Sequence, residues 1–485
     1  MAAMLAPKIA LARAVARLSR LRGGGATSAP GRVLIGLERD AIGALGARLA
    51  RGSALISATN GKTTTAAMAA AIFEHAGVAL VHNAEGANMA GGIATALLTA
   101  ARPREGIAGA LGLSEVDELW LDAVAAQLRP RAILLGNLFR DQLDRFGELE
   151  TIAERWGANL QAEQLVLNAD DPVIADLGRE RPGTLYFGVE DDSLALPGMA
   201  HAADAKHCRR CGAPYIFDAV YLGHLGHYRC PSCGQQRPRP SVSASDVVLE
   251  GVRAARFTLH TPSGQAQVAL ALPGLYNVYN ALAAAALACA LQIPLERILA
   301  GLQQTRAAFG RAETIILKPT SSGAVSGAGR TGTSTVAGTA ASAAASAPRE
   351  LRILLVKNPA GANEVLRTLA LEPGEHDVLG VLNDKIADGR DVSWIWDADF
   401  ELLAGRIRRF TCSGSRAPEL AVRMKYAGVE RARIAIEPDL DRALSRAAAD
   451  RPDEQRPLYA LPTYTAMLSL RELLVARGEA SSSWA

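Results

Sequence analysis

The 485-residue sequence lacks several features that would place it in common classes of protein. Aromatic residues make up only 5% of it, and no apolar run approaches the ~20 residues that a membrane-spanning helix needs. Lys and Arg number 52 against 49 Asp and Glu, so the net charge of +3 does not support a broad nucleic-acid-binding surface. No Ala-x-Ala site follows a sustained apolar core near the N-terminus, so we expect no cleaved signal peptide. At ~100–200 residues per domain, this length predicts two to four domains.

The N-terminal segment, residues 1–31, is basic. Its cations alternate with Leu, Ile, Val and Ala at helical spacing, which predicts an amphipathic helix. These cations are Lys8, Arg13, Arg17, Arg20 and Arg22. Two roles stay open: packing on the first domain, which we favour, and contact with an anionic membrane surface.

Residues 32–318 are expected to form a central α/β domain. The run ALIS before residue 58, RAILLGN at 131–137 and QLVLNADD at 164–171 are typical of strands, and helical or turn sequence follows each of them. Strands that alternate with helices indicate a parallel, doubly wound sheet.

The remainder of the chain divides at a run of small residues. Residues 319–348 are almost wholly Ala, Gly, Ser and Thr, so they cannot bury a core and are predicted to form a flexible linker. A C-terminal α/β domain, residues 349–485, then opens with the strand RILLVKN at 352–358.

Four cysteines interrupt the α/β pattern within the segment 205–238. Cys208, Cys211, Cys230 and Cys233 form C-x2-C-x18-C-x2-C, the spacing of a four-thiolate zinc site. Each C-x2-C pair places two thiolates on one tight turn, and two such turns together complete a tetrahedron of ligands with no open position. We therefore expect a structural Zn²⁺ in a zinc ribbon. Disulfides are the alternative, and the lack of a secretion signal disfavours them.

A phosphate-binding loop is predicted at Ala58-Thr59-Asn60-Gly61-Lys62-Thr63-Thr64-Thr65, between the strand ALIS and the helix AAMAAAIF. In such a loop, amide N–H groups at the helix N-terminus face an anion, Lys62 reaches the phosphates and Thr63 can ligate Mg²⁺. The first Gly of the usual pattern is absent, because that position is Ile56, so taken alone a chance Gly-Lys-Thr stays open. We expect the loop to face solvent and the Lys62 ammonium to have no packing role.

This loop resembles the one in Mur ligases and folylpolyglutamate synthases. Three further segments match motifs of these enzymes in the same order: Asn168-Ala169-Asp170-Asp171-Pro172, Asn277-Val278-Tyr279-Asn280-Ala281 and Gly310-Arg311. The resemblance implies a Mur-ligase-type central ATPase domain and a Rossmann-like C-terminal domain.

Finer features resemble the MurT branch of this family. They are Asn83–Met89, Asn137–Arg145, the zinc ribbon, Lys357–Gly361 and Asp388–Trp394. Where amino-acid-adding ligases usually have a His that holds a second metal, this sequence has Gln142, which is a poor ligand, so a second metal ion is in doubt.

The resemblance implies an ATP-dependent amidation run by two chains. Enzymes of the MurT type activate the α-carboxylate of D-isoglutamate in the lipid II stem peptide as an acyl phosphate. Ammonia from a partner glutaminase, GatD, then gives D-isoglutamine. A heterodimer with a GatD-like chain is therefore expected, in the cytoplasm and at the inner face of the membrane that holds lipid II, with peripheral contact through that substrate and no nucleic acid.

The resemblance also assigns the site residues. Asn60, Gly61, Lys62, Thr63 and Thr64 would bind ATP and Mg²⁺, with Glu115 as a further Mg²⁺ ligand and with Asn280 and Arg311 against the nucleotide. Asp391 would orient the Cys–His pair of the partner glutaminase, and Asp388 is its nearest rival.

Simpler roles stay open for three of these residues. Glu115 is alternatively a solvated loop acid, Asn280 a helix cap and Asp391 an exposed loop carboxylate or cap. Two other functions also stay open: a stand-alone Mur-type ligase that adds an amino acid, and a zinc-ribbon binding protein with a degenerate nucleotide fold. Intact Lys62, Thr63 and Glu115 disfavour the second.

Overall fold

The computed structural model describes residues 2–21, 27–83, 87–102, 106–141, 149–199, 203–305, 313–318, 348–449 and 456–481. The chain forms two compact units. The first unit contains residues 1–308 together with Asn358–Glu372 and Gly389–Asp399. The second contains Phe309–Lys357, Pro373–Asp388 and Phe400–Ala485.

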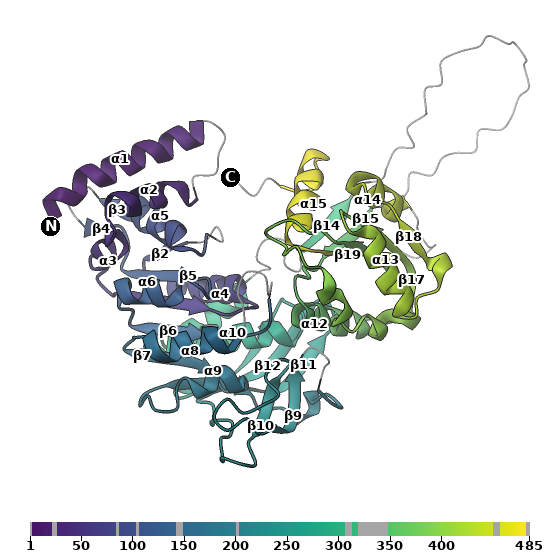
Figure 1. The fold of residues 1–485 in the computed structure, drawn as a ribbon, viewed down its shortest axis with the longest axis horizontal. Helices are drawn as coiled ribbons and strands as arrows, with labels where there is room; N and C mark the ends of the chain where they lie inside the picture. Colours follow the sequence, from purple (N-terminus) through teal and green to yellow (C-terminus); the bar gives the residue numbers. More distant parts are fainter. Residues whose placement is uncertain are drawn as a thin grey trace, which may run out of the picture. The chain divides into compact units, whose positions relative to one another are not determined.

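The first unit is built on a large mixed sheet (Figure 1). The strands from β2 to β11 along the sheet are parallel, and β12 and β13 extend it with antiparallel pairing. Among the described residues its strand order is β13 (Gly264–Leu270), β12 (Ala254–Thr261), β11 (Val242–Glu250), β8 (Leu185–Val189), β7 (Gln164–Asn168), β6 (Ala132–Leu135), β1 (Ser53–Ser57), β5 (Leu111–Glu115) and β2 (Leu80–His82). Every residue of β1, β5 and β6 is buried, as expected for parallel strands with helices on both faces.

Helices cover both faces of this sheet, and each face has its own hydrophobic core. Helix α10 is buried over almost its whole length and packs against α4, because its many alanines let the backbone approach closely. Its α-helices among the described residues are α1 (Ala2–Leu21), α2 (Ala29–Leu37), α3 (Ala41–Gly46), α4 (Lys62–His75), α5 (Ala90–Ala100), α6 (Leu121–Leu128), α8 (Leu149–Asn159), α9 (Pro172–Asp176), α10 (Leu275–Ala290), α11 (Leu295–Gln304) and α12 (Pro359–Ala370).

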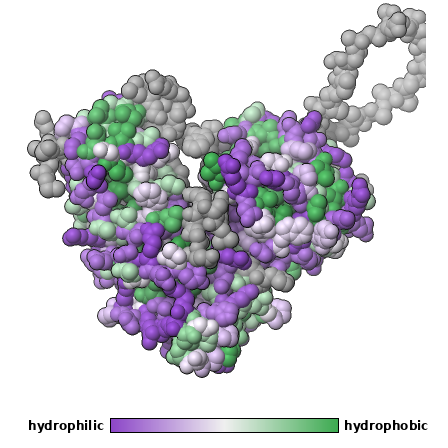
Figure 2. All heavy atoms as spheres, viewed as in Figure 1, coloured by the Kyte–Doolittle hydropathy of each residue, from purple (hydrophilic) through white to green (hydrophobic). Residues whose placement is uncertain are grey.

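The N-terminal helix α1 packs on α2 and α5 of the same unit. Ile9 and Ala12 are buried, and the Lys8 ammonium lies 2.8 Å from Glu38 Oε2. On the visible face of this unit, hydrophobic residues gather in the upper part, where Figure 1 places α1 and α2 (Figure 2). None of the described helices is both long enough and apolar enough to cross a membrane. The packed arrangement is the one that we favoured for this segment.

Two small hairpins are added to the first unit. One pairs β3 (Ala101–Arg102) with β4 (Gly106–Ile107). The other pairs β9 (Ile216–Leu222) with β10 (Leu225–Arg229), and it lies between the two cysteine pairs of the sequence. The cysteine segment is therefore an insertion that forms its own small sheet.

The second unit has a sheet in which all neighbours except β14 and β15 are parallel. Among the described residues its order is β14 (Glu313–Leu317), β15 (Arg349–Ile353), β19 (Leu458–Pro462), β16 (His376–Val381), β17 (Ile407–Ser413) and β18 (Ile434–Ile436). Its helices include α13 (Ala417–Tyr426), α14 (Leu440–Ala449) and α15 (Tyr464–Ala476). Arg349, which is buried, donates to Asp377 Oδ2 at 2.5 Å, so the first residue of β15 is tied to β16, on the far side of β19 in the sheet.

The α/β class with parallel sheets is confirmed. The antiparallel strands β12 and β13 were not anticipated. The strand expected at 352–358 is wrong in its bounds: β15 spans Arg349–Ile353, and Asn358 instead caps the N-terminus of helix α12. The linker predicted at 319–348 lies outside the described residues except for Pro348, and the domain boundaries stay predictions.

Candidate functional site

The predicted phosphate loop lies at the carboxyl end of β1, the strand between β5 and β6. Gly61 ends the loop with φ +84°, in the left-handed region, and α4 begins at Lys62. A Cβ atom on residue 61 would lie 2.0 Å from Asn280 Oδ1. Both the backbone angle and the space therefore require glycine.

The phosphate loop is hydrogen-bonded to residues that follow the neighbouring strand β6. The Asn60 amide donates to Asn137 Oδ1 at 2.9 Å, and Asn137 Nδ2 donates back to the Asn60 carbonyl at 3.0 Å. The Phe139 amide donates to Thr59 Oγ1 at 3.1 Å. Because Asn137 and Phe139 follow β6, the loop is fixed to the neighbouring strand as well as to its own.

The Lys62 side chain is buried. Its Nζ lies 2.9 Å from Glu118 Oε2 and donates to the Ala58 carbonyl at 2.5 Å. Burial alone would lower the pKa of Lys62. The negative charges of Glu118 and Glu115 raise it by more than burial lowers it, so the pKa of Lys62 lies above its ordinary value. The expectation that this ammonium has no packing role was wrong, since the lysine neutralises a buried carboxylate.

Three carboxylates lie within four residues at the end of β5, and all three are buried: Glu115, the last residue of the strand, Asp117 and Glu118. Asn83 holds the backbone of Glu115 through both its N–H and its C=O, at 2.9 and 2.8 Å. Asn88 Nδ2 lies 3.3 Å from Glu115 Oε1. Glu115 is thus not a solvated loop acid.

Sequence reasoning selected Glu115 and missed Glu118, the direct partner of Lys62. The available signal was the density of acids in Ser-Glu-Val-Asp-Glu at the end of a strand.

Asn280 contacts the phosphate loop from α10. Its Oδ1 accepts a hydrogen bond from Thr65 Oγ1 at 3.2 Å, and its Nδ2 donates to Asn277 Oδ1 at 3.1 Å. Asn280 lies within the helix rather than at its cap, which is Gly274, so the alternative role as a cap was wrong. Its predicted contact with a nucleotide stays a prediction.

Helix α12 also reaches the loop, although it lies about three hundred residues later in the chain. Its cap residue Asn358 donates from Nδ2 to Asn60 Oδ1 at 3.0 Å, and Asn358 Oδ1 accepts from the Gly361 amide at 2.9 Å. The segment Lys357–Gly361 was noted in the sequence as a signature, but its contact with Asn60 could not be read from it.

The assembled site can bind a polyphosphate and a hard cation. The first amides of α4 have no side-chain cap, and a helix N-terminus of this kind attracts anions. Thr63, half-buried in the first turn, makes no side-chain hydrogen bond within the described part of the chain. Carboxylate and hydroxyl oxygens are the donors that Mg²⁺ prefers. Thr64 is buried beside them, whereas Arg311 and Gln142 lie outside the described residues.

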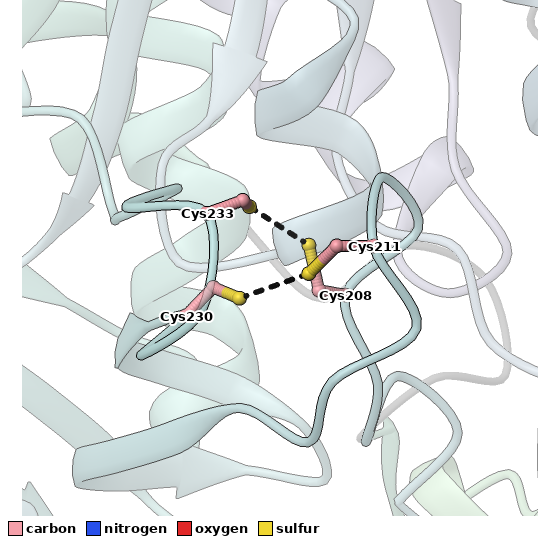
Figure 3. Close-up of side chains that lie close together, drawn as sticks. All are labelled: Cys208, Cys211, Cys230 and Cys233. Carbon is pink, nitrogen blue, oxygen red and sulfur yellow. Dashed lines mark hydrogen bonds between the residues drawn. The ribbon is translucent and has the colours of Figure 1, made fainter.

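The four cysteines of the insertion converge on one point, and Figure 3 shows them pointing toward one another from two turns. All four Sγ atoms lie within 4.8 Å of one another, with Cys208 and Cys233 3.5 Å apart and Cys211 and Cys230 3.4 Å apart. Thiolates ~2.3 Å from one tetrahedral zinc ion would be about 3.8 Å apart. The cluster is therefore compatible with zinc.

The cysteines are surrounded by packed and hydrogen-bonded side chains. Tyr215 and Tyr228 pack with Cys208 and Cys230 in a small apolar cluster. Gln235 Oε1 accepts from the Tyr215 hydroxyl at 2.9 Å. Contacts made around the ligands of a metal ion help to fix the orientation of those ligands.

The two candidate aspartates of the C-terminal region differ sharply. Asp388 is buried, and its Oδ1 accepts from the Thr465 amide at 2.7 Å while its Oδ2 accepts from the Thr465 hydroxyl. Asp391 is exposed, and the Ser393 amide donates to its Oδ1 at 2.8 Å. This backbone hydrogen bond and one from the Ser393 side chain lower the pKa of Asp391. Of the two, only Asp391 presents an ionised carboxylate to solvent.

A model of the Mur ligase middle domain matches residues 56–210, and a model of the MurT ligase C-terminal domain matches residues 355–467. Among solved structures, a pseudomurein peptide ligase type C from Methanothermus fervidus is similar with a TM-score of 0.64 at 22% identity, over 88% of this chain and 79% of that one. MurF from Acinetobacter baumannii is similar with a TM-score of 0.60 at 18% identity, over 92% and 80%. These two likenesses show a Mur ligase fold.

Relatives by sequence match nearly end to end. The chain is 30% identical to the lipid II isoglutaminyl synthase (glutamine-hydrolyzing) subunit MurT of Streptococcus pneumoniae over 95% of this chain and 94% of that protein. It is also 30% identical to the subunit of that name in Staphylococcus aureus strain N315, over 96% and 97%. The chain therefore belongs to the MurT family of Mur-ligase-like subunits.

Proposed function

We propose that this chain is the synthetase subunit of a two-chain ligase that amidates the α-carboxylate of D-isoglutamate in lipid II. The observation that carries the proposal is the loop 58–61, with Lys62 held against buried carboxylates, in a chain that matches lipid II isoglutaminyl synthase subunits over nearly its full length. A stand-alone amino-acid ligase has no comparable support, because the D-glutamate ligases that match cover only 54% of this chain.

ATP supplies the activating phosphoryl group. One carboxylate oxygen of the substrate attacks the γ-phosphorus, the bond from that phosphorus to the β,γ-bridging oxygen breaks, and ADP leaves. Ammonia then attacks the carbonyl carbon, the carbon–oxygen bond to phosphate breaks, and the nitrogen loses a proton as the amide forms. Such a two-step route is needed because a free carboxylate is a poor electrophile.

The residues of the site divide this work. Gly61, Lys62 and Thr63 would bind the phosphates through the first turn of α4, with Lys62 leaving Glu118 to neutralise the transferred charge. Asn60 and Asn280 fix the shape of the loop. Mg²⁺, when bound, supplies charge neutralisation on the phosphates, and Thr63 and Glu115 would hold it. Arg311 would contact the nucleotide.

The zinc we propose at the four cysteines is structural. Four thiolates leave no coordination position for an activated water, and the ion would cross-link the two turns at the base of the β9–β10 hairpin.

The partner we propose is a GatD-like glutaminase that supplies ammonia, with Asp391 completing its catalytic triad. An exposed carboxylate, ionised and oriented by Ser393, is suited to accept the imidazole N–H of another chain. Trp396 follows in the same segment with half of its surface exposed, and exposed Trp is typical of protein interfaces. The resulting heterodimer would act in the cytoplasm, at the membrane that carries lipid II.

Replacing Cys208 with Ser should lower zinc content and soluble yield together, because the ion holds the ribbon together. Zinc per chain, measured by mass spectrometry of the metal, and thermal unfolding check this. Cys289→Ser, outside the cluster in α10, should keep the zinc. A stable zinc-free Cys208→Ser protein would refute a structural role.

Lys62→Ala should lower ATP turnover by on the order of 10²-fold or more, as loss of a charge-stabilising group does. It should also destabilise the fold, because an unpaired buried carboxylate costs about 3–5 kcal/mol. The double variant Lys62→Met with Glu118→Gln should recover stability without recovering turnover. Turnover near the wild-type rate in either variant contradicts the phosphate-loop assignment.

Asp391→Asn should lower glutamine hydrolysis by the partner, by up to ~10⁴-fold if the carboxylate orients the base. Ammonium salt should restore amidation, since the loop around Lys62 is unchanged, whereas the Lys62 variants should not be rescued. Asp397→Asn removes a carboxylate from the same segment and serves as the matched control. Normal glutamine hydrolysis by Asp391→Asn would remove it from the triad, and a defect that ammonium cannot rescue would assign it to synthesis.

A further inference from the structure

The turn of the β9–β10 hairpin is buried in the first unit rather than exposed. His224, in this turn, has no exposed surface, and its ring centroid lies 4.6 Å from that of Phe139. Its neighbour Gly223 has φ +60°, and a Cβ there would lie 2.7 Å from Phe139 Cε1. The turn of a zinc-ribbon hairpin thus packs directly on the segment that follows β6.

The imidazole of His224 also faces Asp171. Its Nε2 lies 3.4 Å from Asp171 Oδ2, and both side chains are completely buried. Within the described part of the chain neither ring nitrogen forms a hydrogen bond. A leucine or phenylalanine would fill this space without burying two polar atoms, so packing alone does not account for a histidine here.

Phe139 belongs to the segment that fixes the phosphate loop, and Asp171 holds that segment in place. Asp171 Oδ2 accepts from the Leu138 amide at 2.9 Å, and the Phe139 amide donates to Thr59 Oγ1 at 3.1 Å. One residue earlier, Asn137 exchanges two hydrogen bonds with Asn60. His224 therefore contacts one side chain of the segment 137–139, that of Phe139, and the Asp171 carboxylate that holds the Leu138 amide of the same segment.

The ribbon is anchored to the same region at a second place. The Gly226 amide donates to the Asp170 carbonyl at 2.9 Å, and Arg237 Nε lies 2.5 Å from Asp170 Oδ1 in a buried ion pair. Burial alone would lower the pKa of Arg237, but Asp170 raises it above its ordinary value. The cysteine pairs lie just outside β9 and β10, so an ion that joins them would fix both ends of the hairpin.

We infer that the zinc ribbon positions the phosphate loop, and that His224 is the positioning residue through which it acts, by its contacts with Phe139 and Asp171. The inference rests on the proposed ATP site. Loosening this contact lets residues 137–139 shift, which weakens the hydrogen bonds to Thr59 and Asn60 and so the affinity for ATP. Chemistry at saturating ATP is preserved, because Lys62 and the carboxylates are untouched.

The test measures ATP binding by isothermal titration calorimetry on the complex of both chains, with amidation from ammonium salt as a second readout. His224→Ala should raise the Kd and KM for ATP by about tenfold while kcat at saturating ATP changes little. His224→Gln, which keeps a buried polar group of similar reach, should recover part of the affinity. Asp218→Ala, an exposed position on β9 of the same hairpin, is the matched control and should bind ATP like the wild type.

Zinc content is measured on every variant, and a second arm removes zinc from the wild-type complex with a chelator while circular dichroism follows the fold. Loss of zinc should raise the Kd for ATP at least as much as His224→Ala does. An unchanged Kd in zinc-loaded His224→Ala, or in the zinc-free wild type, would overturn the inference. If His224→Ala loses its zinc, the Kd values for ATP of His224→Gln and of the zinc-free wild type test the inference instead. Failure of the wild type itself to bind ATP would instead refute the proposed function.

Discussion

The arrangement of the phosphate loop depends on a buried ion pair between Lys62 and Glu118. Two charges out of water are costly, and their attraction offsets the cost only if the geometry is good and the other lone pairs and protons are satisfied. Lys62 meets this requirement with a second bond to the Ala58 carbonyl. The rest of the loop is correspondingly rigid, with asparagines from three other segments bonded to it or packed on it: Asn137, Asn280 and Asn358. If the loop binds a polyphosphate as proposed, its fixed conformation would reduce the entropy lost on binding.

The structure also explains why this loop does not need the first glycine of the common pattern to adopt its conformation. That position, Ile56, is a fully buried residue of β1 and pairs in register with Glu115 and Leu134 on its two neighbours. The turn proper is shorter, and its strained point is Gly61, where Asn280 leaves no room for a Cβ. Asn280, from another helix, thus supplies contacts that in a longer loop would come from the loop's own residues.

Local features were predictable from the sequence and long-range ones were not. The strand, loop and helix at residues 53–75 follow from neighbouring residues, and the cysteine spacing alone indicated two turns that meet. Which of three successive carboxylates meets Lys62 depends on how the chain turns after β5, where the Asp117 amide bonds to the Asn88 carbonyl. The contacts of Asn358 with Asn60, and of His224 with Phe139, join segments far apart in sequence, so neither could be derived from spacing. Asp388 was the nearest rival of Asp391 in the sequence, and only the structure shows that Asp388 is buried whereas Asp391 is exposed.

The central claim is that this chain activates a carboxylate by phosphorylation, and oxygen isotopes test it most directly. Lipid II labelled with ¹⁸O in the α-carboxylate of its D-isoglutamate would be incubated with the complex, ATP and ammonium salt, and the inorganic phosphate examined by ³¹P nuclear magnetic resonance. The account predicts that each phosphate released with amidation carries one ¹⁸O, because the carbon–oxygen bond to the activated oxygen breaks. Amidated product accompanied by phosphate free of ¹⁸O would contradict it.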